Sequence, residues 1–361
     1  MANFTDVFDD VTKEGHKISK ESYLPEGLYP IIDQGQEYIA GYANDASGLY
    51  YNVPAIIFGD HTRIIKYIDT PCFLGADGVK LLRAKNPDAN YKYLYYALCN
   101  AQIPDTGYNR HFKWLKEVDI PLPGASKQEH IVSVLDKING MIDLRKRQLD
   151  KLDELVKARF VEMFENIAES ANSVLLDSIC EMVTVGIANS ATHAYTEDGI
   201  IMFRNQNIKD NYLDDSDLIY IHPKFADKYK TKALKENDIL VTRTGYPGVA
   251  CIVPKKYEGC QTFTTLIVRL NEESPINANY VCHYINSSYG KRYVDETKVG
   301  VAQQNFGAKV LAKMPIFLPP SKQQQEFHFF TEQVSECKLT IQRGLDKLET
   351  MKKALMQQFF G

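Results

Sequence analysis

The sequence predicts an α+β protein: two mixed α/β domains, separated by a pair of long antiparallel coiled-coil helices, in an internal tandem repeat. Three observations lead to this fold class. A heptad pattern runs through residues 126–164, a second one closes the chain, and residues 196 positions apart repeat each other. We therefore expect a first domain at 1–125, a long helix at 126–165, a second domain at 166–320 and a second long helix at 321–361.

The first long helix is predicted from a narrow apolar stripe. Its positions recur at alternating spacings of four and three, as in a helix that packs along one seam. Two of them are arginines, which we interpret as lying at the edge of the seam or facing another subunit. A helix of this length would extend about 58 Å. The seam positions are Ile131, Leu135, Ile138, Ile142, Arg145, Leu149, Leu152, Val156, Arg159 and Met163.

The second long helix carries a similar stripe, whose spacing changes beside Gly344. Two consecutive spacings of four there indicate a stutter, which shifts a supercoil locally without ending it. Because a whole domain separates the two helices, they can return alongside each other antiparallel and bury each other's stripes. The seam positions are Phe327, Phe330, Val334, Cys337, Ile341, Leu345, Leu348, Lys352, Leu355 and Phe359.

The repeat is clearest where each domain meets its helix. With an offset of 196 residues, Leu115, Ile120, Leu122 and Pro123 match Leu311, Ile316, Leu318 and Pro319. We match Gln128-Glu129 with Gln325-Glu326, which needs a shift of one residue. The offset of 196 then returns, and Leu-Asp-Lys-Leu at 149–152 recurs at 345–348. The chain therefore reads as domain, helix, domain, helix.

Each domain is expected to mix short strands with one packed helix. In the first, β-branched runs that end at turn residues predict strands within 26–33, 53–60, 62–68 and 78–84. Aromatic residues at helical spacing predict a helix at 90–101. In the second, we expect a strand within 199–210, a hairpin at 237–254, a strand within 262–271 and a helix at 277–296.

The composition of the chain and the absence of several motifs exclude some classes of function. No segment forms a basic block, and the formal net charge is −4, so DNA binding would depend on local patches or on a partner subunit. The sequence has no phosphate-binding loop, no dinucleotide-binding glycine motif and no Cys/His metal spacing. The acidic start lacks a signal-peptide core, which predicts a cytoplasmic protein. We therefore expect no ATP hydrolysis by this chain and no metal site in it.

Several stretches resemble the specificity subunit of Type I restriction–modification systems. The similarity rests on the IPLP and IFLPP boundaries, on the helix ends LDKLDELVKARFVEMF and LDKLETMKKALMQQFF, and on DILVTRTGYPGVACIVP and GVAQQNFGAKVLAKMPIFLPP. The first domain matches the pattern less well than the second, and residues 124–126 depart from it. The resemblance covers essentially the whole chain.

The resemblance implies a non-catalytic, DNA-binding subunit with two target-recognition domains and no cofactor of its own. Each domain would read one half of a bipartite double-stranded DNA site, and the helix pair would set the gap. Two methyltransferase subunits, which bind S-adenosylmethionine and methylate adenine, would dock on this scaffold. Restriction subunits that use ATP and Mg²⁺ can join them. A Type IIB-like modification system and a coiled-coil adaptor without DNA remain alternatives.

Candidate DNA contacts are polar residues in loops, because Arg reads guanine and Asn or Gln reads adenine. The alternative for each is a solvated turn or a residue that caps a strand. In the first domain they are His61, Thr62, Arg63, Tyr108, Asn109, Arg110, His111 and Lys113. In the second they are Arg204, Asn205, Gln206, Asn207, Arg243, Thr244, Tyr246, Gln303, Gln304 and Asn305.

Overall fold

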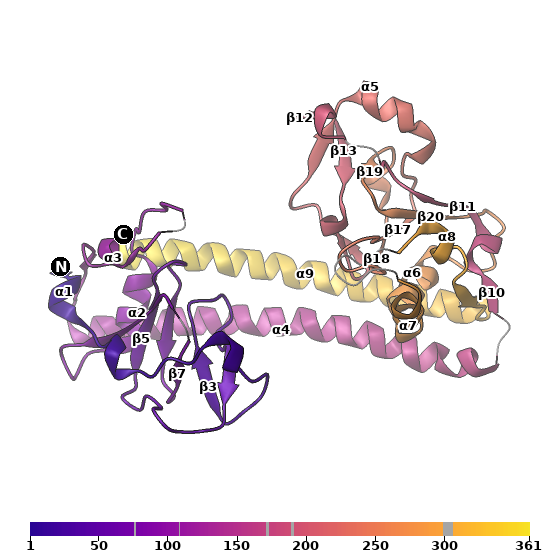
Figure 1. The fold of residues 1–361 in the computed structure, drawn as a ribbon. Helices are drawn as coiled ribbons and strands as arrows, with labels where there is room; N and C mark the ends of the chain where they lie inside the picture. Colours follow the sequence, from indigo (N-terminus) through magenta and orange to yellow (C-terminus); the bar gives the residue numbers. More distant parts are fainter. Residues whose placement is uncertain (76, 108, 171–172, 189–190, 299–305) are drawn as a thin grey trace. The chain divides into compact units, whose positions relative to one another are not determined.

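Both long helices are divided between two compact units. The computed structural model describes residues 1–75, 77–107, 109–170, 173–188, 191–298 and 306–361, without the side chains of 165–170. One unit comprises Met1–Arg147 and Gln342–Gly361, and the other Gln148–Ile341. Helix α4 spans Ala125–Ser170 and α9 spans Ser321–Phe360, so each contributes a segment to each unit (Figure 1). The four-segment division of the chain stays a prediction.

The first unit is built on two small sheets. Among its described residues, one sheet has the order β2-β8-β5-β6 with antiparallel neighbours, formed by Phe8–Asp10, Val79–Ala84, Ala55–Gly59 and Ile65–Ile68. The other has the order β4-β3-β7, formed by Gly41–Ala43, Tyr29–Ile32 and Phe73–Leu74, and β3 and β7 run parallel. Strands β1 (Ala2–Asn3) and β9 (Asp119–Ile120) pair antiparallel. The predicted strands at 26–33, 53–60, 62–68 and 78–84 are confirmed.

The shorter helices of the first unit share one hydrophobic core with the sheet and the long helices. They are α1 (Phe4–Val7), α2 (Tyr91–Cys99) and α3 (Phe112–Leu115). Asn90 caps α2, because its side chain accepts from the N–H of Tyr93 and satisfies a donor that the first helical turn leaves open. The core joins α2 and the sheet to both long helices through Leu94, Ile131 and Met356. The predicted helix at 90–101 is confirmed.

The second unit contains a sheet of the same connectivity. Its order is β11-β20-β17-β18, formed by Cys180–Val185, Leu266–Leu270, Ile239–Val241 and Ala250–Ile252. A second sheet has the order β12-β16-β13-β19, formed by Tyr195–Thr196, Ile219–Ile221, Ile200–Phe203 and Gln261–Thr262. Two antiparallel pairs complete the described strands: β10 (Ser173–Leu175) with β21 (Pro315–Phe317), and β14 (Ile208–Lys209) with β15 (Tyr212–Leu213). The predicted hairpin at 237–254 is the antiparallel pair of β17 and β18.

The helix predicted at 277–296 is wrong in one respect, because it is two helices. They are α6 (Ala278–Asn286) and α7 (Ser288–Thr297). Ser287 between them is extended, at φ −73° and ψ 173°, and its hydroxyl donates to the carbonyl of Tyr284 at 2.6 Å. A serine that bonds a neighbouring carbonyl in this way competes with the helix. Two short helices, α5 (Pro223–Ala226) and α8 (Ala308–Leu311), also belong to the second unit.

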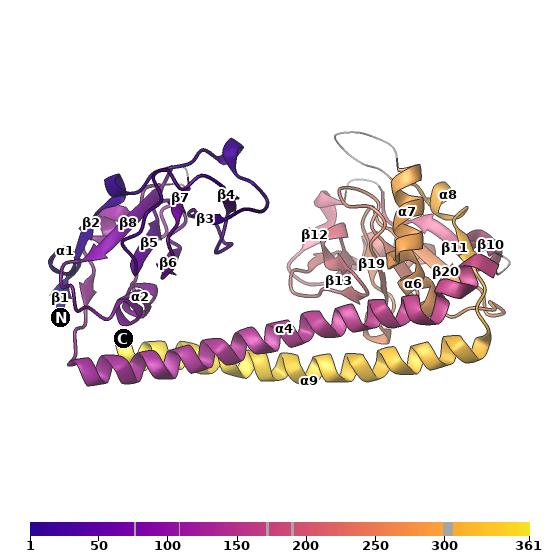
Figure 2. The same cartoon turned by 90° about the horizontal axis from the view of Figure 1, so that it is seen from below.

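Segments of α4 and α9 pack together inside each unit (Figure 2). In the first unit, the start of α4 meets the end of α9, where Lys146 and Glu349 form an ion pair at 3.8 Å. In the second, the end of α4 meets the start of α9, where Lys338 pairs with Asp153. Segments that pair in this order run antiparallel. No helix among the described residues is long and apolar enough to cross a membrane.

The seam of α4 departs from the predicted heptad near its end. Ile131, Leu135, Ile138, Ile142 and Val156 are buried as predicted, and Arg145 is exposed. Beyond Val156 the buried side chains are Phe160 and Phe164, in place of the predicted Arg159 and Met163. The larger rings replace the heptad positions because they pack against Tyr280 of α6 and Phe327 of α9, with ring centroids 4.9–5.7 Å apart.

The one-residue shift in the predicted repeat is also wrong. Gln128 Nε2 donates to the carbonyl of Pro123 at 2.8 Å, and Gln324 Nε2 donates to that of Pro319 at 2.9 Å. Gln128 therefore corresponds to Gln324, with the unbroken offset of 196, and not to Gln325.

Candidate nucleic-acid interface

In the first unit, the turn between β5 and β6 lies against the loop that precedes α3. His111 is buried beneath both, and its N–H and its ring Nδ1 donate to the Asp60 carbonyl at 2.8 and 3.0 Å. The Asp60 carboxylate accepts from the N–H of Phe112 at 2.7 Å. Above them, His61 Nδ1 donates to the Asn109 carbonyl at 3.2 Å. Turn and loop, 48 residues apart in sequence, therefore form one surface, which we call the first-unit surface (residues 60–63, 105–107 and 109–113).

Arg63 joins the two halves of this surface. Its backbone lies in the left-handed region, at φ 62°, which is uncommon for a residue other than glycine. One guanidinium nitrogen donates to the Asp105 carboxylate at 2.7 Å and another to the carbonyl of Ile103 at 3.3 Å. The Gly107 N–H and the Arg63 guanidinium hold the pKa of Asp105 below its ordinary value, so this carboxylate stays charged.

The predicted contacts of the first domain differ in exposure. Thr62, Asn109, Arg110 and Lys113 are exposed, and the Lys113 ammonium lies 4.0 Å from the centre of the Trp114 ring. His111 is only 1 % exposed, so it supports the surface from beneath and does not form part of its exposed face. Tyr108 lies outside the described residues.

Gln34 supports the turn from the other sheet, and the sequence offered no signal for it. Its side-chain oxygen accepts from the N–H of His61 at 3.1 Å, and its carbonyl accepts from the Thr62 hydroxyl at 2.7 Å. Its amide nitrogen donates to the carbonyl of Asp77 at 3.0 Å. A glutamine that lies 27 residues before its partner in sequence cannot be identified from a local pattern.

In the second unit, the turn between β17 and β18 meets the residues that follow β13. Asn205 Nδ2 donates to the Thr244 hydroxyl at 2.7 Å, and the N–H of Arg243 donates to Asn205 Oδ1 at 3.4 Å. Gly245 supplies the positive φ of 77° that this turn needs, and the Tyr246 side chain next to it is 89 % exposed. Two predicted clusters, 38 residues apart, are thereby brought together as the second-unit surface (204–207 and 243–246).

Asp217, which was not predicted from the sequence, accepts hydrogen bonds from three residues of the second-unit surface. Its carboxylate accepts from Arg204 at 2.9 Å and from Gln206 at 2.6 Å. Its carbonyl accepts from Asn207 at 2.9 Å and from Arg204 at 3.2 Å. Asn207 is 2 % exposed and also accepts from the N–H of Arg204, so it supports the cluster from inside. Asp217 follows no recognisable motif.

The last predicted cluster, Gln303, Gln304 and Asn305, lies outside the described residues. The residue that follows it is placed, and the N–H of Phe306 donates to the carbonyl of Arg243 at 2.9 Å. The first unit has the same arrangement, where the N–H of His111 donates to Asp60 just before α3. In each unit the chain before the short helix is bonded to the turn of the central hairpin.

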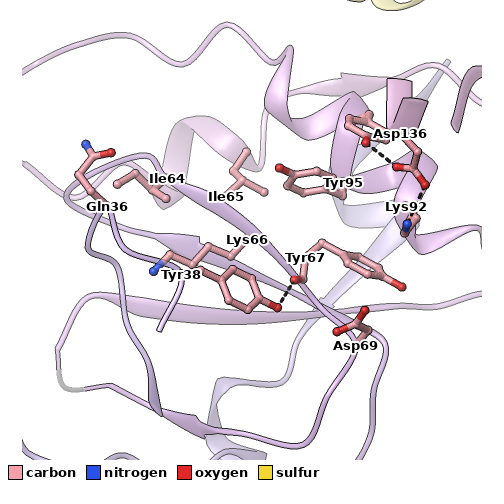
Figure 3. Close-up of a pocket in the computed structure, with 11 residues that line it drawn as sticks. Gln36, Tyr38, Ile64, Ile65, Lys66, Tyr67, Asp69, Lys92, Tyr95 and Asp136 are labelled. Atoms are coloured by element: carbon pink, nitrogen blue, oxygen red, sulfur yellow. Dashed lines mark hydrogen bonds and ion pairs between the residues drawn. The ribbon is translucent and has the colours of Figure 1, made fainter. Parts of the chain in front are cut away.

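A cavity of about 540 Å³ opens elsewhere in the first unit, between β6, α2 and α4 (Figure 3). Tyr38, Tyr67 and Tyr95 line it, and none of its lining residues is a predicted DNA contact. At its edge, Asp136 of α4 accepts from the Lys92 ammonium at 2.7 Å and from the Tyr96 hydroxyl at 2.6 Å. These bonds join the globular part of the unit to its helix.

The two surfaces offer the donors that duplex DNA binds. Arg, Lys, Asn and Gln side chains on loops can bind phosphates and base edges, and in each unit a hairpin turn presents part of the set. A family model described as the Type I restriction modification DNA specificity domain matches residues 2–154 and 170–350. The chain belongs to this family.

Two proteins similar to this chain share little sequence identity with it. The EcoR124I/EcoR124II specificity subunit of a Type I restriction enzyme from Escherichia coli is 23 % identical over 357 residues, which cover 91 % of this chain and 85 % of that one. The crystal structure of an S subunit of a Type I restriction–modification system from M. genitalium is 14 % identical, with a TM-score of 0.56. That match covers 99 % of this chain and 95 % of the other, and it supports the fold alone.

Proposed function

We propose that this chain is the sequence-specific DNA-recognition subunit of a Type I restriction–modification complex. Each globular domain reads one half of a bipartite site on double-stranded DNA. The observation that carries this proposal is the contact, in each unit, between a polar hairpin turn and a second polar segment. His61 meets Asn109 in the first unit, and Asn205 meets Thr244 in the second. Two separate surfaces of this kind suit a site with two parts.

The long helices act as the spacer between the half-sites. We propose that α4 and α9 form an antiparallel coiled-coil pair in a tandemly repeated chain, as the antiparallel contacts and the common strand order within each unit support. A helix pair of fixed length would hold the two reading domains at a set separation on the duplex. Since one helical turn of DNA measures about 34–36 Å, the helix length limits the allowed gap.

Catalysis belongs to partner subunits in this proposal. Two methyltransferase subunits, which would bind S-adenosylmethionine and methylate adenine, dock on the helix pair, and restriction subunits that use ATP and Mg²⁺ can join. The chain itself contributes no cofactor or metal. With a formal net charge of −4, it would bind DNA weakly alone and rely on its partners for much of the positive charge.

The test is to co-express the chain with the methyltransferase subunits of its system and to sequence the modified adenines. The expected result is a gapped motif with two specific halves. A continuous motif would contradict two-domain reading, and the absence of any methylation that depends on the chain would favour a coiled-coil adaptor. Cleavage on both sides of the motif by a fused nuclease would indicate a Type IIB-like system.

Changes in helix length test the spacer. Inserting seven residues into both α4 and α9 preserves the heptad phase and adds about 10 Å, or about three base pairs. The gap in the motif should lengthen while both half-sites stay the same. An unchanged gap with altered half-sites would exclude the helices as the spacer.

A further inference from the structure

Each proposed DNA surface holds an arginine against an aspartate from another loop. In the first unit Arg63 donates to Asp105 at 2.7 Å, and in the second Arg204 donates to Asp217 at 2.9 Å. The two pairs are alike in exposure: the arginine side chains are 33 % and 28 % exposed, and both aspartates are 67 % exposed. Neither aspartate belongs to the hairpin turn or the β13 segment that presents the arginine.

A carboxylate on a surface that meets DNA has an electrostatic cost. DNA is a dense polyanion, so each exposed aspartate repels the phosphates and weakens binding to every sequence alike. An aspartate in such a place therefore needs a benefit that outweighs the loss of non-specific DNA affinity. One such benefit is to fix the orientation of a long, flexible arginine, because a charge-assisted hydrogen bond to a carboxylate holds the planar guanidinium in one direction.

The remaining donors of Arg204 suit one base edge. Its Nε is buried and has no hydrogen-bond partner among the described residues, and one terminal nitrogen already binds both the carboxylate and the carbonyl of Asp217. The exposed donors that remain are therefore the two N–H groups of the other terminal nitrogen. These donors can bind the O6 and N7 acceptors of guanine in the major groove, which is the commonest specific arginine contact.

Asp217 also positions a second reader. Gln206 donates one N–H to the same carboxylate at 2.6 Å, which leaves its side-chain oxygen and its other N–H available. That pair of groups is the one with which glutamine reads adenine N6 and N7. In the first unit, Asp105 is itself immobilised, because its second oxygen accepts from the N–H of Gly107 at 3.0 Å.

We propose that Asp105 and Asp217 are specificity-determining positioning residues, each of which aims an arginine, Arg63 or Arg204, at one base of its own half-site. The inference rests on the proposed function, in which each unit reads one half of the motif. The aspartates touch no base in this role, and they act through the side chains that they hold.

The two units provide controls for each other. The full-length chain with Asp217→Ala, co-expressed with its methyltransferase subunits, should lose discrimination by about tenfold at one or two bases of one half-site. The other half of the motif should stay unchanged. Asp105→Ala should do the reverse. Glu26→Ala and Glu258→Ala, which remove one exposed carboxylate from each unit, should change neither half.

A double variant separates positioning from simple charge removal. If Asp217 acts through Arg204, then adding Asp217→Ala to an Arg204→Ala chain should change the arginine's base position no further. Stronger methylation of all sequences with an unchanged motif, or equal loss in both half-sites, would overturn the inference. If the wild-type motif is not bipartite, the proposed function fails instead, so the two failures are distinguishable.

Discussion

Gln128 and Gln324 make the same hydrogen bond in the two units, each to the carbonyl of the proline five residues before it. The distances are 2.8 Å to Pro123 and 2.9 Å to Pro319. Each bond closes the first turn of a long helix onto the end of a domain. Gln324 is 4 % exposed and does more, because it also accepts from the N–H of Asn277 at 3.0 Å and donates to the carbonyl of Pro275 at 2.9 Å.

Gln324→Ala should therefore destabilise the second unit by about 1–3 kcal/mol, since it leaves buried backbone groups without partners. Gln128→Ala removes one half-buried hydrogen bond and should cost about 1 kcal/mol in the first unit. Hydrogen exchange of α6 and α9 during urea unfolding measures the effect on the second unit. Gln325→Ala, at the exposed neighbour, is the control. Equal effects of the Gln324 and Gln325 changes would contradict this account.

Asp238 and Arg269 form a buried ion pair at the central sheet of the second unit. The side chains are 1 % and 8 % exposed, and two parallel hydrogen bonds of 2.8 and 2.6 Å join them. Asp238→Ala strands a buried guanidinium and should lower the free energy of unfolding by about 3–5 kcal/mol. Glu181→Ala removes a half-exposed carboxylate 3.9 Å from the same arginine and should cost less than about 1 kcal/mol. Hydrogen exchange in β17 and β20 reports both, and comparable losses would count against the buried pair.

His283 makes the second unit sensitive to acid. Burial against the Phe160 and Phe327 rings lowers its pKa to about 4; Asp210 raises that pKa, while Lys338 and Lys157 lower it. Because the ordinary pKa is about 6.5, the folded state binds fewer protons than the unfolded chain between these values. The free energy of unfolding should thus fall as the pH drops from about 6.5 to 4, by up to about 3 kcal/mol, and no further below that.

His283→Leu should remove this part of the pH dependence. The measurement is the difference between wild type and variant from pH 7 to 4, which cancels the carboxylates that titrate in the same range. Exchange in α6 is the suitable probe, since the single tryptophan, Trp114, reports on the first unit. Parallel stability curves for the two proteins would show that His283 does not carry the effect.

Arg110 and Arg243 are also predicted to contact DNA directly, one on each surface. Replacing either with alanine should cost about 1–3 kcal/mol of binding in the assembled complex. A base contact would relax one motif position, whereas a phosphate contact would weaken all sequences alike and flatten the salt dependence. Titration of specific and scrambled duplexes at several salt concentrations separates the two. Lys20→Ala and Lys255→Ala serve as charge-matched controls, and wild-type affinity in both arginine variants would remove these residues from the interface.

The sequence by itself determined the features that depend on local periodicity and on residue type. The buried positions Ile131, Leu135, Ile138 and Ile142 follow from heptad spacing, because a helix repeats every 3.6 residues whatever surrounds it. The hairpin at 237–254 follows from apolar runs around a glycine-containing turn. The polar clusters were predicted by residue type, since few side chains read base edges.

Only the tertiary structure decided which of these residues meet. The contacts between His61 and Asn109 and between Asn205 and Thr244 depend on the packing of loops. These loops lie 38–48 residues apart in sequence, so no local pattern encodes their contact. Phe160 and Phe164 displace the predicted Arg159 and Met163 because rings from α6 and α9 complete their packing. The supporting roles of Gln34, Asp105 and Asp217 were found only from their hydrogen bonds with distant partners. A single polar side chain belongs to no periodic pattern, so the sequence does not show which residue it will bind.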